Sequence, residues 1–259
     1  MLSNVRFIYF DLDDTLCGYW DASKAALRRT FEEHPVATHS LEELLDAWAR
    51  EFRVFAKEVK RPEWYSIYLQ DGGVTRTEQM RRVLRGLGID QEELAQRMSD
   101  FYGRHRNESL MLFPDAVAVL DELKQRGFGL GLMTNGPADV QRAEIATLGI
   151  GHYFDPVLIE GEVGEGKPLR SAFARAERLA DSDPGELLFV GNSYRHDILP
   201  AITFGWHSVW IRRAGDVAPS LRGETAKPEE RRPEDPSPDY EINELSELLA
   251  LLPPVVPRR

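Results

Sequence analysis

A short apolar run that stops at a cluster of carboxylates is the feature that most constrains the fold of this chain. Residues 5–10 read VRFIYF, and Asp11, Asp13 and Asp14 follow them directly. A run that is this short and ends this abruptly is typical of a buried strand in a parallel sheet rather than of a helix. We therefore expect the first strand of a sheet here, with the carboxylates at its carboxyl end.

The chain beyond Leu112 predicts the rest of that sheet, because helical stretches alternate there with short apolar runs in the rhythm of β-α-β units. The predicted helices are residues 114–126, 138–148, 169–180 and 197–204, and the predicted strands are residues 128–133, 156–159, 187–190 and 207–211. A last short strand and helix are expected within residues 240–252. The predicted fold class is α/β, with a doubly wound parallel sheet.

Residues 21–106 differ from this pattern, since they have helical periodicity and almost no strand signals. Apolar residues recur at spacings of three and four and form one stripe of a helix: Leu41, Leu44, Leu45, Trp48, Phe52, Phe55 and Val59. Further helices are predicted at residues 77–87 and from Asp90, whose spacing to Glu93 is that of a capping box. Helix-breaking composition predicts a loop between residues 59 and 75. We expect a compact helical bundle.

Charge and cysteine content exclude several classes of protein. Lys and Arg number 32 and Asp and Glu 43, and the resulting net charge of −11 has the wrong sign for neutralising nucleic-acid phosphates. Cys17 is the only cysteine, which excludes an intramolecular disulfide and a multi-cysteine metal site. No apolar stretch approaches a membrane span, and residues 1–10 lack the features of a signal peptide. We expect a cytoplasmic protein that binds neither nucleic acid nor membranes.

Residues 213–238 stand apart from the units on either side. This segment holds five prolines, many charged residues and almost no large apolar ones. Such a composition buries too little apolar surface to offset the entropy of ordering the chain. We therefore expect a mobile loop.

Two pairs of polar residues that follow predicted strands could perform metal-assisted chemistry on a phosphate ester. Asp11 and Asp13 are two residues apart, so one can act as nucleophile and the other as proton donor at one substrate. Asn192 follows the strand at residues 187–190, and Asp197 begins the next helical stretch. Their carbonyl and carboxylate oxygens are the ligands that Mg²⁺ prefers.

Two further polar sites could bind the phosphate itself. Thr134 and Asn135 lie between a predicted strand and the next helix, where a hydroxyl and free backbone N–H groups can face an anion. Lys167 lies in a glycine-rich loop, and its ammonium could neutralise phosphate charge. Each feature alone is equally typical of a helix cap or a solvated surface. Together they follow parallel strands, whose carboxyl ends share one edge of a sheet, so a composite site is predicted.

In their order and placement these residues resemble the four motifs of the haloacid dehalogenase superfamily of phosphohydrolases. The matching residues are 11–15, 134–135, 167–168, and 191–193 with Asp197. The resemblance covers nearly the whole chain and implies a Rossmann-like catalytic core of residues 1–17 and 109–259. It also implies an all-helical cap domain of residues 18–108, inserted after the first strand. Only residues 213–238 have no obvious counterpart in the family.

The resemblance implies a Mg²⁺-dependent phosphatase that hydrolyses a small phosphorylated metabolite through an aspartyl phosphate. It makes Asp11 the nucleophile and Asp13 the general acid for the leaving group and then the general base for water. Thr134 and the backbone at Asn135 would hold the transferred phosphoryl group. Lys167 would screen the charge between that group and the nucleophile.

The same resemblance places Mg²⁺ among Asp11, the backbone carbonyl of Asp13, and Asp197. Asn192 stands where the family commonly has Asp, so it keeps a carbonyl oxygen near the metal but removes one formal charge. We expect weaker Mg²⁺ binding from this departure and no loss of catalysis.

Several alternatives remain open on the sequence. A 2-haloacid dehalogenase uses the same nucleophile without metal, although members of that kind lack the second catalytic carboxylate. A phosphomutase differs only in its acceptor, and a receiver-like phosphoacceptor module also combines clustered Asp with Thr and Lys. Four cap residues could contact the leaving group or simply pack the cap: Arg61, Trp64, Tyr65 and Tyr68. The protein is expected to be a monomer or a homodimer.

Overall fold

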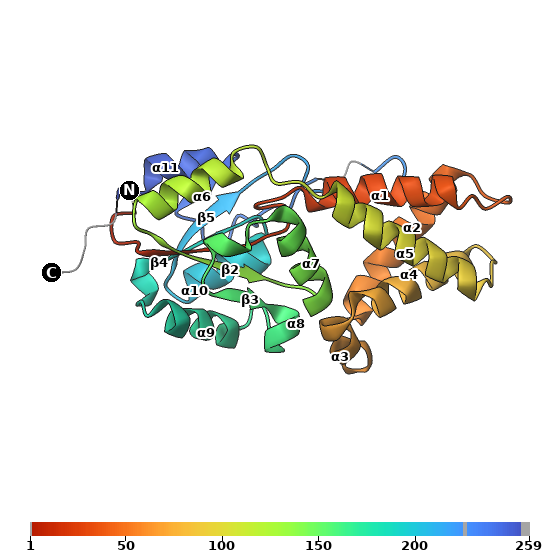
Figure 1. The fold of residues 1–259 in the computed structure, drawn as a ribbon, viewed down its shortest axis with the longest axis horizontal. Helices are drawn as coiled ribbons and strands as arrows, with labels where there is room; N and C mark the ends of the chain where they lie inside the picture. Colours follow the sequence, from red (N-terminus) through yellow and green to blue (C-terminus); the bar gives the residue numbers. More distant parts are fainter. Residues whose placement is uncertain (1, 225–226, 255–259) are drawn as a thin grey trace.

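A parallel sheet of six strands forms the larger part of the molecule, in the order β3-β2-β1-β4-β5-β6 (Figure 1). The computed structural model describes residues 2–224 and 227–254. The strands are β1 (Phe7–Phe10), β2 (Gly129–Thr134), β3 (Val157–Ile159), β4 (Leu187–Gly191), β5 (His207–Ile211) and β6 (Tyr240–Ile242). All neighbouring strands pair in parallel. The predicted α/β class and doubly wound sheet are confirmed, and the predicted strands lie close to the observed ones.

Alternating side chains of the central strand face two separate hydrophobic cores. Ile8 and Phe10 belong to one cluster of buried residues and Tyr9 to another, because successive side chains of a strand point to opposite faces. Helices α6 (Ala116–Gln125), α7 (Ala138–Leu148) and α11 (Leu248–Leu251) contribute to the first core, and α9 (Arg170–Ala180) and α10 (Leu199–Thr203) to the second. Because helices cover both faces of the sheet, the ends of the strands remain as the place for a polar site.

The strand order reverses beside β1, which pairs with β2 on one side and with β4 on the other. In open α/β sheets, ligands bind outside the carboxyl ends of the strands at such a reversal. Asp11 follows β1 and Asn192 follows β4, so the two lie on either side of this point. The short helix α8 (Glu160–Val163) follows β3 at the same edge.

Five helices form a second unit at one side of the sheet (Figure 1). They are α1 (Tyr19–Glu33), α2 (Leu41–Glu58), α3 (Pro62–Gln70), α4 (Gly72–Gly86) and α5 (Glu92–Ser109). The unit has its own core of buried side chains: Ala26, Leu27, Phe31, Leu44, Ala47, Trp48, Met80, Val83, Leu84, Ala95, Met98 and Tyr102. We call α1–α5 the helical unit and the rest of the chain the sheet unit.

The predicted apolar stripe on α2 contributes side chains to the core of the helical unit and to the part of α2 that faces the sheet unit. Ser40 caps the helix through a capping box, in which Glu43 N–H donates to Ser40 Oγ at 3.3 Å and Ser40 N–H donates to Glu43 Oε2 at 2.7 Å. Leu44 and Trp48 pack into the core. Phe55 also lies on this stripe and is buried, one to two turns further along, where the helix faces the sheet unit.

The predicted loop between residues 59 and 75 is wrong, because this segment forms α3 and the start of α4. Pro62 occupies the first turn of α3, where a missing N–H is tolerated. Asp71 caps α4, since its Oδ1 accepts hydrogen bonds from the N–H groups of Gly73 at 2.8 Å and Val74 at 3.2 Å. Proline and aspartate here begin helices rather than break one.

The predicted capping box at Asp90 is also wrong. Helix α5 begins at Glu92, and its N-cap is Gln91, whose side chain makes no capping hydrogen bond. Asp90 instead forms an ion pair with Arg85 at the end of α4, at 3.5 Å. The predicted helix at residues 197–204 is divided into a π-helical turn (Tyr194–Ile198) and α10.

The segment at residues 213–238 has no helix or strand in its described part, yet it contacts both units. Arg222 donates from Nε to Asp46 Oδ2 of α2 at 2.9 Å, and Glu224 forms an ion pair with Arg53 of the same helix. Tyr194 donates to the carbonyl of Pro236 at 2.6 Å. The expected mobility of this segment stays a prediction. Among the described residues, no helix has both the length and the apolar character that a membrane span requires.

Candidate active site

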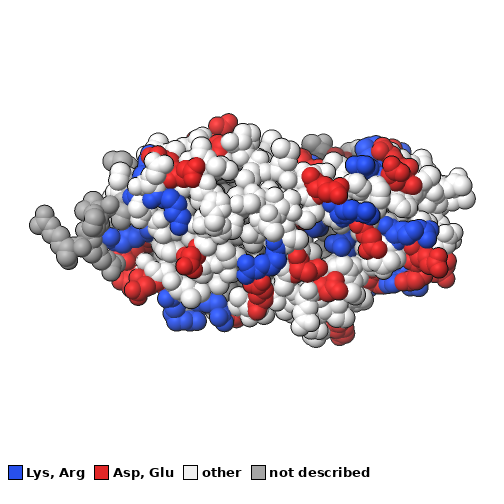
Figure 2. Space-filling model, viewed as in Figure 1, with Lys and Arg blue, Asp and Glu red and all other residues white. Residues whose placement is uncertain are grey.

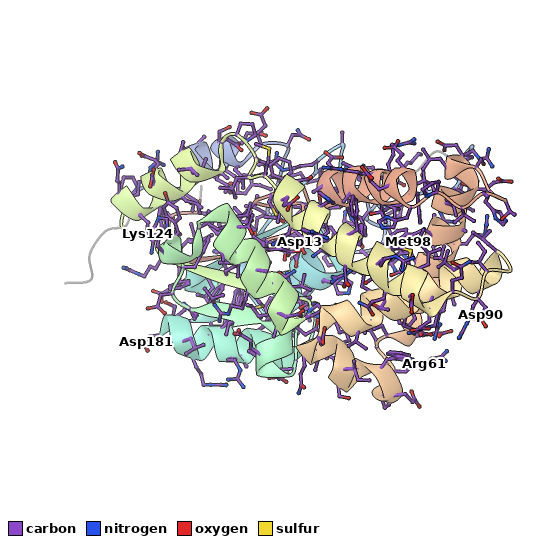
Figure 3. All side chains as sticks on the ribbon, turned by 45° about the vertical axis from the view of Figure 1, so that its right-hand side comes forward. Asp13, Arg61, Asp90, Met98, Lys124 and Asp181 are labelled. Carbon is purple, nitrogen blue, oxygen red and sulfur yellow. The ribbon has the colours of Figure 1, made fainter. Side chains whose placement is uncertain are left out.

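A cavity of about 480 Å³ lies between the sheet unit and the helical unit. The ends of β1, β2 and β4 line it with polar residues, including Asp11, Asp13, Thr134 and Asn192. The helical unit lines it mainly with aromatic residues: Tyr19, Trp20, Trp48, Phe52, Phe55, Tyr68 and Tyr102. Figure 3 shows Asp13 at the junction between the two units. The four predicted motifs therefore meet at one site.

A buried lysine joins two carboxylates at the sheet end of the cavity. Lys167 Nζ donates to Asp11 Oδ1 at 2.6 Å and lies 2.7 Å from Asp197 Oδ1. Burial alone would lower the pKa of Lys167, but the two carboxylates hold it above its ordinary value. The lysine is therefore charged, and it neutralises part of the negative charge of Asp11 and Asp197.

Asp197 reaches this position because the end of β4 carries no side chain in its way. A Cβ at Gly191 would lie 2.3 Å from Asp197 Oδ2, so only glycine admits the carboxylate. The same Oδ2 accepts a hydrogen bond from the N–H of Ser193 at 3.0 Å. Burial raises the pKa of Asp197 to about 7, although the Lys167 ammonium favours its charged form.

Asp13 lies in an environment that favours its protonated form. Burial raises the pKa of this carboxyl well above its ordinary value, and the carboxylates of Glu144, Asp11 and Asp14 raise it further. Gln141 Nε2 donates a hydrogen bond to Asp13 Oδ2 at 3.1 Å, which opposes the shift without reversing it. A carboxyl group that keeps its proton to a higher pH than usual is suited to act as a general acid.

The side chain of Asn135, in the second predicted motif, positions the backbone of Lys167, in the third. Asn135 Nδ2 donates to the backbone carbonyl of Lys167 at 2.7 Å, and the N–H of Lys167 donates to Asn135 Oδ1 at 2.8 Å. This reciprocal pair fixes the backbone from which Lys167 reaches the carboxylates. Thr134 is buried, and its Oγ1 donates to Gln141 Oε1 at 2.6 Å.

The candidate metal ligands form an oxygen-rich group. Thr15 Oγ1 lies 3.3 Å from both Asp11 Oδ2 and Asn192 Oδ1, which brings these two oxygens to the same place. Asn192 Nδ2 donates to Asp216 Oδ2 at 2.9 Å, and this bond turns the amide oxygen toward the site. Two carboxylates, a backbone carbonyl and an amide oxygen fit Mg²⁺, which is usually bound through one or two carboxylates and neutral oxygens.

No cluster of three or more His, Cys, Asp or Glu side chains with metal-binding geometry occurs within residues 2–224 and 227–254. A metal at this site therefore depends on neutral oxygens as well as on Asp11 and Asp197. That dependence gives the amide of Asn192 more weight than it would have beside a third carboxylate.

Sequence reasoning missed a buried network that connects the site to the helical unit. Gln141 Nε2 also donates to Glu144 Oε2 at 2.8 Å, and Glu144 forms an ion pair with Arg106 of α5 at 3.0 Å. Gln141 and Glu144 are three residues apart on α7 and both are buried. The spacing was readable in the sequence, but nothing local indicated that this helix face turns toward Asp13. Asp216 was also missed, because nothing near it in the sequence indicated that it would contact Asn192.

The four candidate specificity residues all lie on α3 or at its N-cap, but of these only Tyr68 lines the cavity. Tyr65 donates to Glu160 Oε1 at 2.7 Å, and Trp64 packs edge-on against Phe55 with ring centroids 5.5 Å apart. Arg61 is exposed at the N-cap of α3, at the outer edge of the helical unit in Figure 3.

Comparison with known sequences gives the same assignment as the site geometry. Residues 5–205 match the haloacid dehalogenase-like hydrolase family, and residues 164–248 match a related HAD-hydrolase-like family. The chain belongs to the haloacid dehalogenase-like hydrolases. Membership accounts for the order of the four motifs along the sheet edge and identifies the chain as a hydrolase.

Individual relatives of this hydrolase span almost the whole chain. It is similar to N-acylneuraminate-9-phosphatase of Mus musculus, with 29% identity over 252 residues, 97% of this chain and 95% of the relative. It is also similar to glyceraldehyde 3-phosphate phosphatase of Methanopyrus kandleri, with 30% identity over 250 residues, 95% of this chain and 96% of the relative. Both alignments include the helical unit.

Among solved structures, the hydrolase is similar to YfnB of Bacillus subtilis, a HAD-hydrolase bound to magnesium. The TM-score is 0.68 at 21% identity, and the match covers 95% of this chain and 98% of that one. Because the identity is low, this likeness concerns the fold alone. It extends over both units, so the arrangement of a helical unit beside a parallel sheet is common to the two proteins.

Proposed function

We propose that this chain is a Mg²⁺-dependent phosphatase that hydrolyses a small phosphorylated metabolite through an aspartyl-phosphate intermediate. It is a hydrolase acting on phosphoric monoesters, the reaction class of its phosphatase relatives. The observation that carries the proposal is the arrangement around Asp11: Lys167 Nζ lies 2.6 Å from its carboxylate, and a carboxyl with a strongly raised pKa, Asp13, lies two residues away. Nucleophile, charge neutralisation and proton donor face one cavity.

In the first half of the reaction, a carboxylate oxygen of Asp11 attacks the phosphorus and the bond to the ester oxygen breaks. Asp13 donates its proton to that leaving oxygen. In the second half, Asp13 takes a proton from water, the water oxygen attacks the phosphorus, and Asp11 is released with inorganic phosphate. The raised pKa of Asp13 suits the first role, because the group keeps a proton to donate up to a higher pH than an ordinary carboxyl does.

Positioning and charge neutralisation supply most of the catalysis in phosphoryl transfer. Lys167 offsets negative charge at Asp11, and Asn135 holds the backbone of Lys167. Thr134 and the backbone at Asn135 would bind oxygens of the transferred group. Mg²⁺, when held by Asp11, Asp197, the backbone carbonyl of Asp13 and Asn192, would supply positive charge to the phosphoryl oxygens.

The helical unit, in this proposal, is a cap domain over the catalytic core, with the boundaries near residues 17 and 109. It closes the cavity on the side away from the sheet, and Tyr68 contributes to the surface that a leaving group would meet. We further propose that the enzyme acts in the cytoplasm, as a monomer or homodimer, without nucleic-acid or membrane partners.

The test is turnover of p-nitrophenyl phosphate and of a panel of phosphorylated metabolites, with Mg²⁺ and after chelation. We expect Mg²⁺-dependent release of inorganic phosphate. Release of halide from 2-haloacids would favour the dehalogenase alternative, which the presence of Asp13 disfavours. Formation of an isomeric phosphate ester would indicate a mutase, and a single phosphorylation event without turnover would indicate a receiver-like module. Any of these three results would contradict the proposal.

A further inference from the structure

The part of the cavity wall that the helical unit forms carries a guanidinium that makes no ion pair with a carboxylate among the described residues. Arg76 lies on α4 and lines the cavity together with Gly72, Thr75 and Gln79, which share its face of the helix. Its Nε donates to the backbone carbonyl of Ser99 at 3.2 Å. In the described part of the chain, no Asp or Glu oxygen lies within the 4.0 Å of an ion pair with Arg76.

Arg76 is largely withdrawn from water despite lacking a counter-ion. Burial lowers its pKa, and the neighbouring charge of Arg106 lowers it further. The guanidinium packs against the backbone of α5, where a Cβ at Gly103 would lie 2.7 Å from Arg76 Cζ. A buried, uncompensated charge is unfavourable unless an anion completes it. The position is therefore suited to a negatively charged group that enters with the substrate.

Two further donors at this wall also lack acceptors. Gln79 Nε2 and Arg106 Nε are buried and have no hydrogen-bond partner among the described residues. Buried donors of this kind are uncommon in native proteins, and each calls for an explanation. Both residues line the same cavity as Arg76. Three donors around one space are explained together by an oxygen-bearing ligand.

The charges at this wall favour a ligand group with one negative charge. Arg106 is already compensated by Glu144 at 3.0 Å, and its guanidinium also lies over the rings of Tyr19 and Tyr102. Among the described residues that line the cavity, Arg76 is the lysine or arginine with no ion pair within 4.0 Å, although Glu144 and Asp139 interact with it electrostatically over longer distances. A carboxylate matches one charge and the planar fork of arginine, whereas a second phosphate would bring close to two negative charges.

The cavity also has an apolar part beside these polar groups. Trp20, Trp48 and Phe52 form part of its side wall, with ring centroids 5.5 Å apart for Trp20 and Phe52 and 5.1 Å apart for Trp48 and Phe52. On the face of the molecule in Figure 2, acidic and basic residues are interspersed over both units. Inside the cavity, Lys167 pairs with Asp11 and Asp197 on the sheet side, whereas Arg76 lies on the helical side without an ion pair among the described residues.

We propose that Arg76, assisted by Gln79, binds a carboxylate that the substrate carries in addition to its phosphate. This inference rests on the proposed phosphatase function and names the substrate class: phosphate monoesters of carboxylic acids. Arg76 is a binding residue that selects among esters and does not take part in the phosphoryl chemistry at Asp11.

The test compares matched pairs of esters that differ in the carboxylate. Suitable pairs are 3-phosphoglycerate with glycerol 3-phosphate, and 6-phosphogluconate with sorbitol 6-phosphate. A charge-assisted hydrogen bond in a buried site contributes a factor of about 10 to 100. We therefore expect the native enzyme to prefer the carboxylate member of at least one pair by about this factor in kcat/KM, and we expect Arg76→Met to bring that ratio close to one.

Three further variants make the result specific to Arg76. Arg76→Lys keeps the charge but loses the planar guanidinium, so it should retain an intermediate preference. Arg76 also holds α4 against α5, and the lysine variant shows whether an effect of Arg76→Met comes from the lost charge or from disturbed packing. Gln79→Leu should lower the ratio by a smaller factor. Arg104→Met removes an exposed arginine of α5 that does not line the cavity, and it should leave the ratio unchanged.

The outcomes separate this inference from the function on which it rests. Hydrolysis of p-nitrophenyl phosphate by a native enzyme that shows no preference in any pair would overturn the carboxylate site and leave the phosphatase proposal intact. Absence of turnover on every phosphate ester would contradict the function itself. A stronger preference for a bisphosphate than for the carboxylates, or a preference that survives in both Arg76→Met and Arg76→Lys, would also overturn the inference.

Discussion

The two ends of the cavity differ in how completely their polar groups are paired. At the sheet end, Lys167 is shared between Asp11 and Asp197, and Gln141 bonds to Asp13, so the groups are held in position before any substrate arrives. At the helical end, Arg76 and Gln79 retain unused donors. Polar groups that are already paired are held in position for chemistry before the substrate binds. Polar groups without a partner can instead pair with groups of the ligand. Under the proposed function, the sheet unit would therefore determine the reaction and the helical unit the substrate.

The largest expected effect follows from removing the nucleophile at the sheet end. Asp11→Asn should lower kcat by several orders of magnitude, as for other residues that act as one catalytic unit, because an amide is no nucleophile toward phosphorus. Thermal unfolding should show that the variant is folded. Asp90→Asn, a change at an exposed residue at the far end of the helical unit (Figure 3), serves as the control. Hydrolysis by Asp11→Asn at near the native rate would contradict the mechanism.

A somewhat smaller effect is expected for the proton donor. Asp13→Asn should reduce turnover of sugar phosphates by about 10²- to 10⁴-fold, the usual contribution of general acid catalysis. Turnover of p-nitrophenyl phosphate should fall much less, because p-nitrophenolate leaves without a proton.

The pH dependence tests the same residue in the native enzyme. Asp13 must be protonated to donate, and its pKa is raised. The kcat/KM for a poor leaving group should therefore be maintained at low pH and fall as the pH rises through that raised pKa. A profile that falls equally for p-nitrophenyl phosphate would remove Asp13 from the acid role.

The metal site is expected to give an effect of several-fold and to connect the sheet unit with residues 213–238. Asn192→Asp alone would set two carboxylates against each other, since Asn192 donates to Asp216 at 2.9 Å. The double variant Asn192→Asp with Asp216→Asn preserves the hydrogen bond and moves the charge to the metal ligand. It should reach half-maximal activity at a lower Mg²⁺ concentration than the native enzyme, because attraction to a divalent ion rises with ligand charge.

A binding measurement accompanies that activity titration. Mg²⁺ should raise the Tm of the double variant more than that of the native protein, since a ligand that binds the folded state stabilises it. Asp197→Asn should raise the Mg²⁺ requirement or abolish activity. If the double variant needed more Mg²⁺ than the native enzyme, or if activity survived thorough chelation, the metal has been placed wrongly.

The smallest effect is expected at the helical end, outside the proposed carboxylate site. Tyr68→Leu should raise KM for a metabolite substrate by a few-fold with little change in kcat, because Tyr68 lines the cavity but takes part in none of the proposed chemical steps. Arg61→Ala changes an exposed residue of the same segment and should leave both constants unchanged. An equal rise in KM for the two variants would show that the surface of α3, rather than the cavity, meets the substrate.

Local errors in the helical unit have identifiable causes. Pro62 and Asp71 suggest a loop by composition, but each starts a helix, because proline fits the first turn and aspartate accepts from free N–H groups. At Asp90 the opposite error occurred: the spacing of a capping box was present, yet the helix begins at Glu92. Pro and Asp occur both in turns and at the first residues of helices. In both cases, neighbours several residues away determined which of the two structures forms.

The sequence by itself determined the parallel sheet and the reaction site, because both depend on short-range patterns. Apolar runs of strand length ended in Asp11, Thr134 and Asn192, and parallel strands place such residues at one edge regardless of the details of packing. The tertiary structure alone decided which distant residues pair: Glu144 with Arg106, and Asn192 with Asp216. It also left Arg76 without an ion pair among the described residues. These depend on which helix faces turn toward each other, and helix packing is set by the sum of many side-chain contacts rather than by any local pattern.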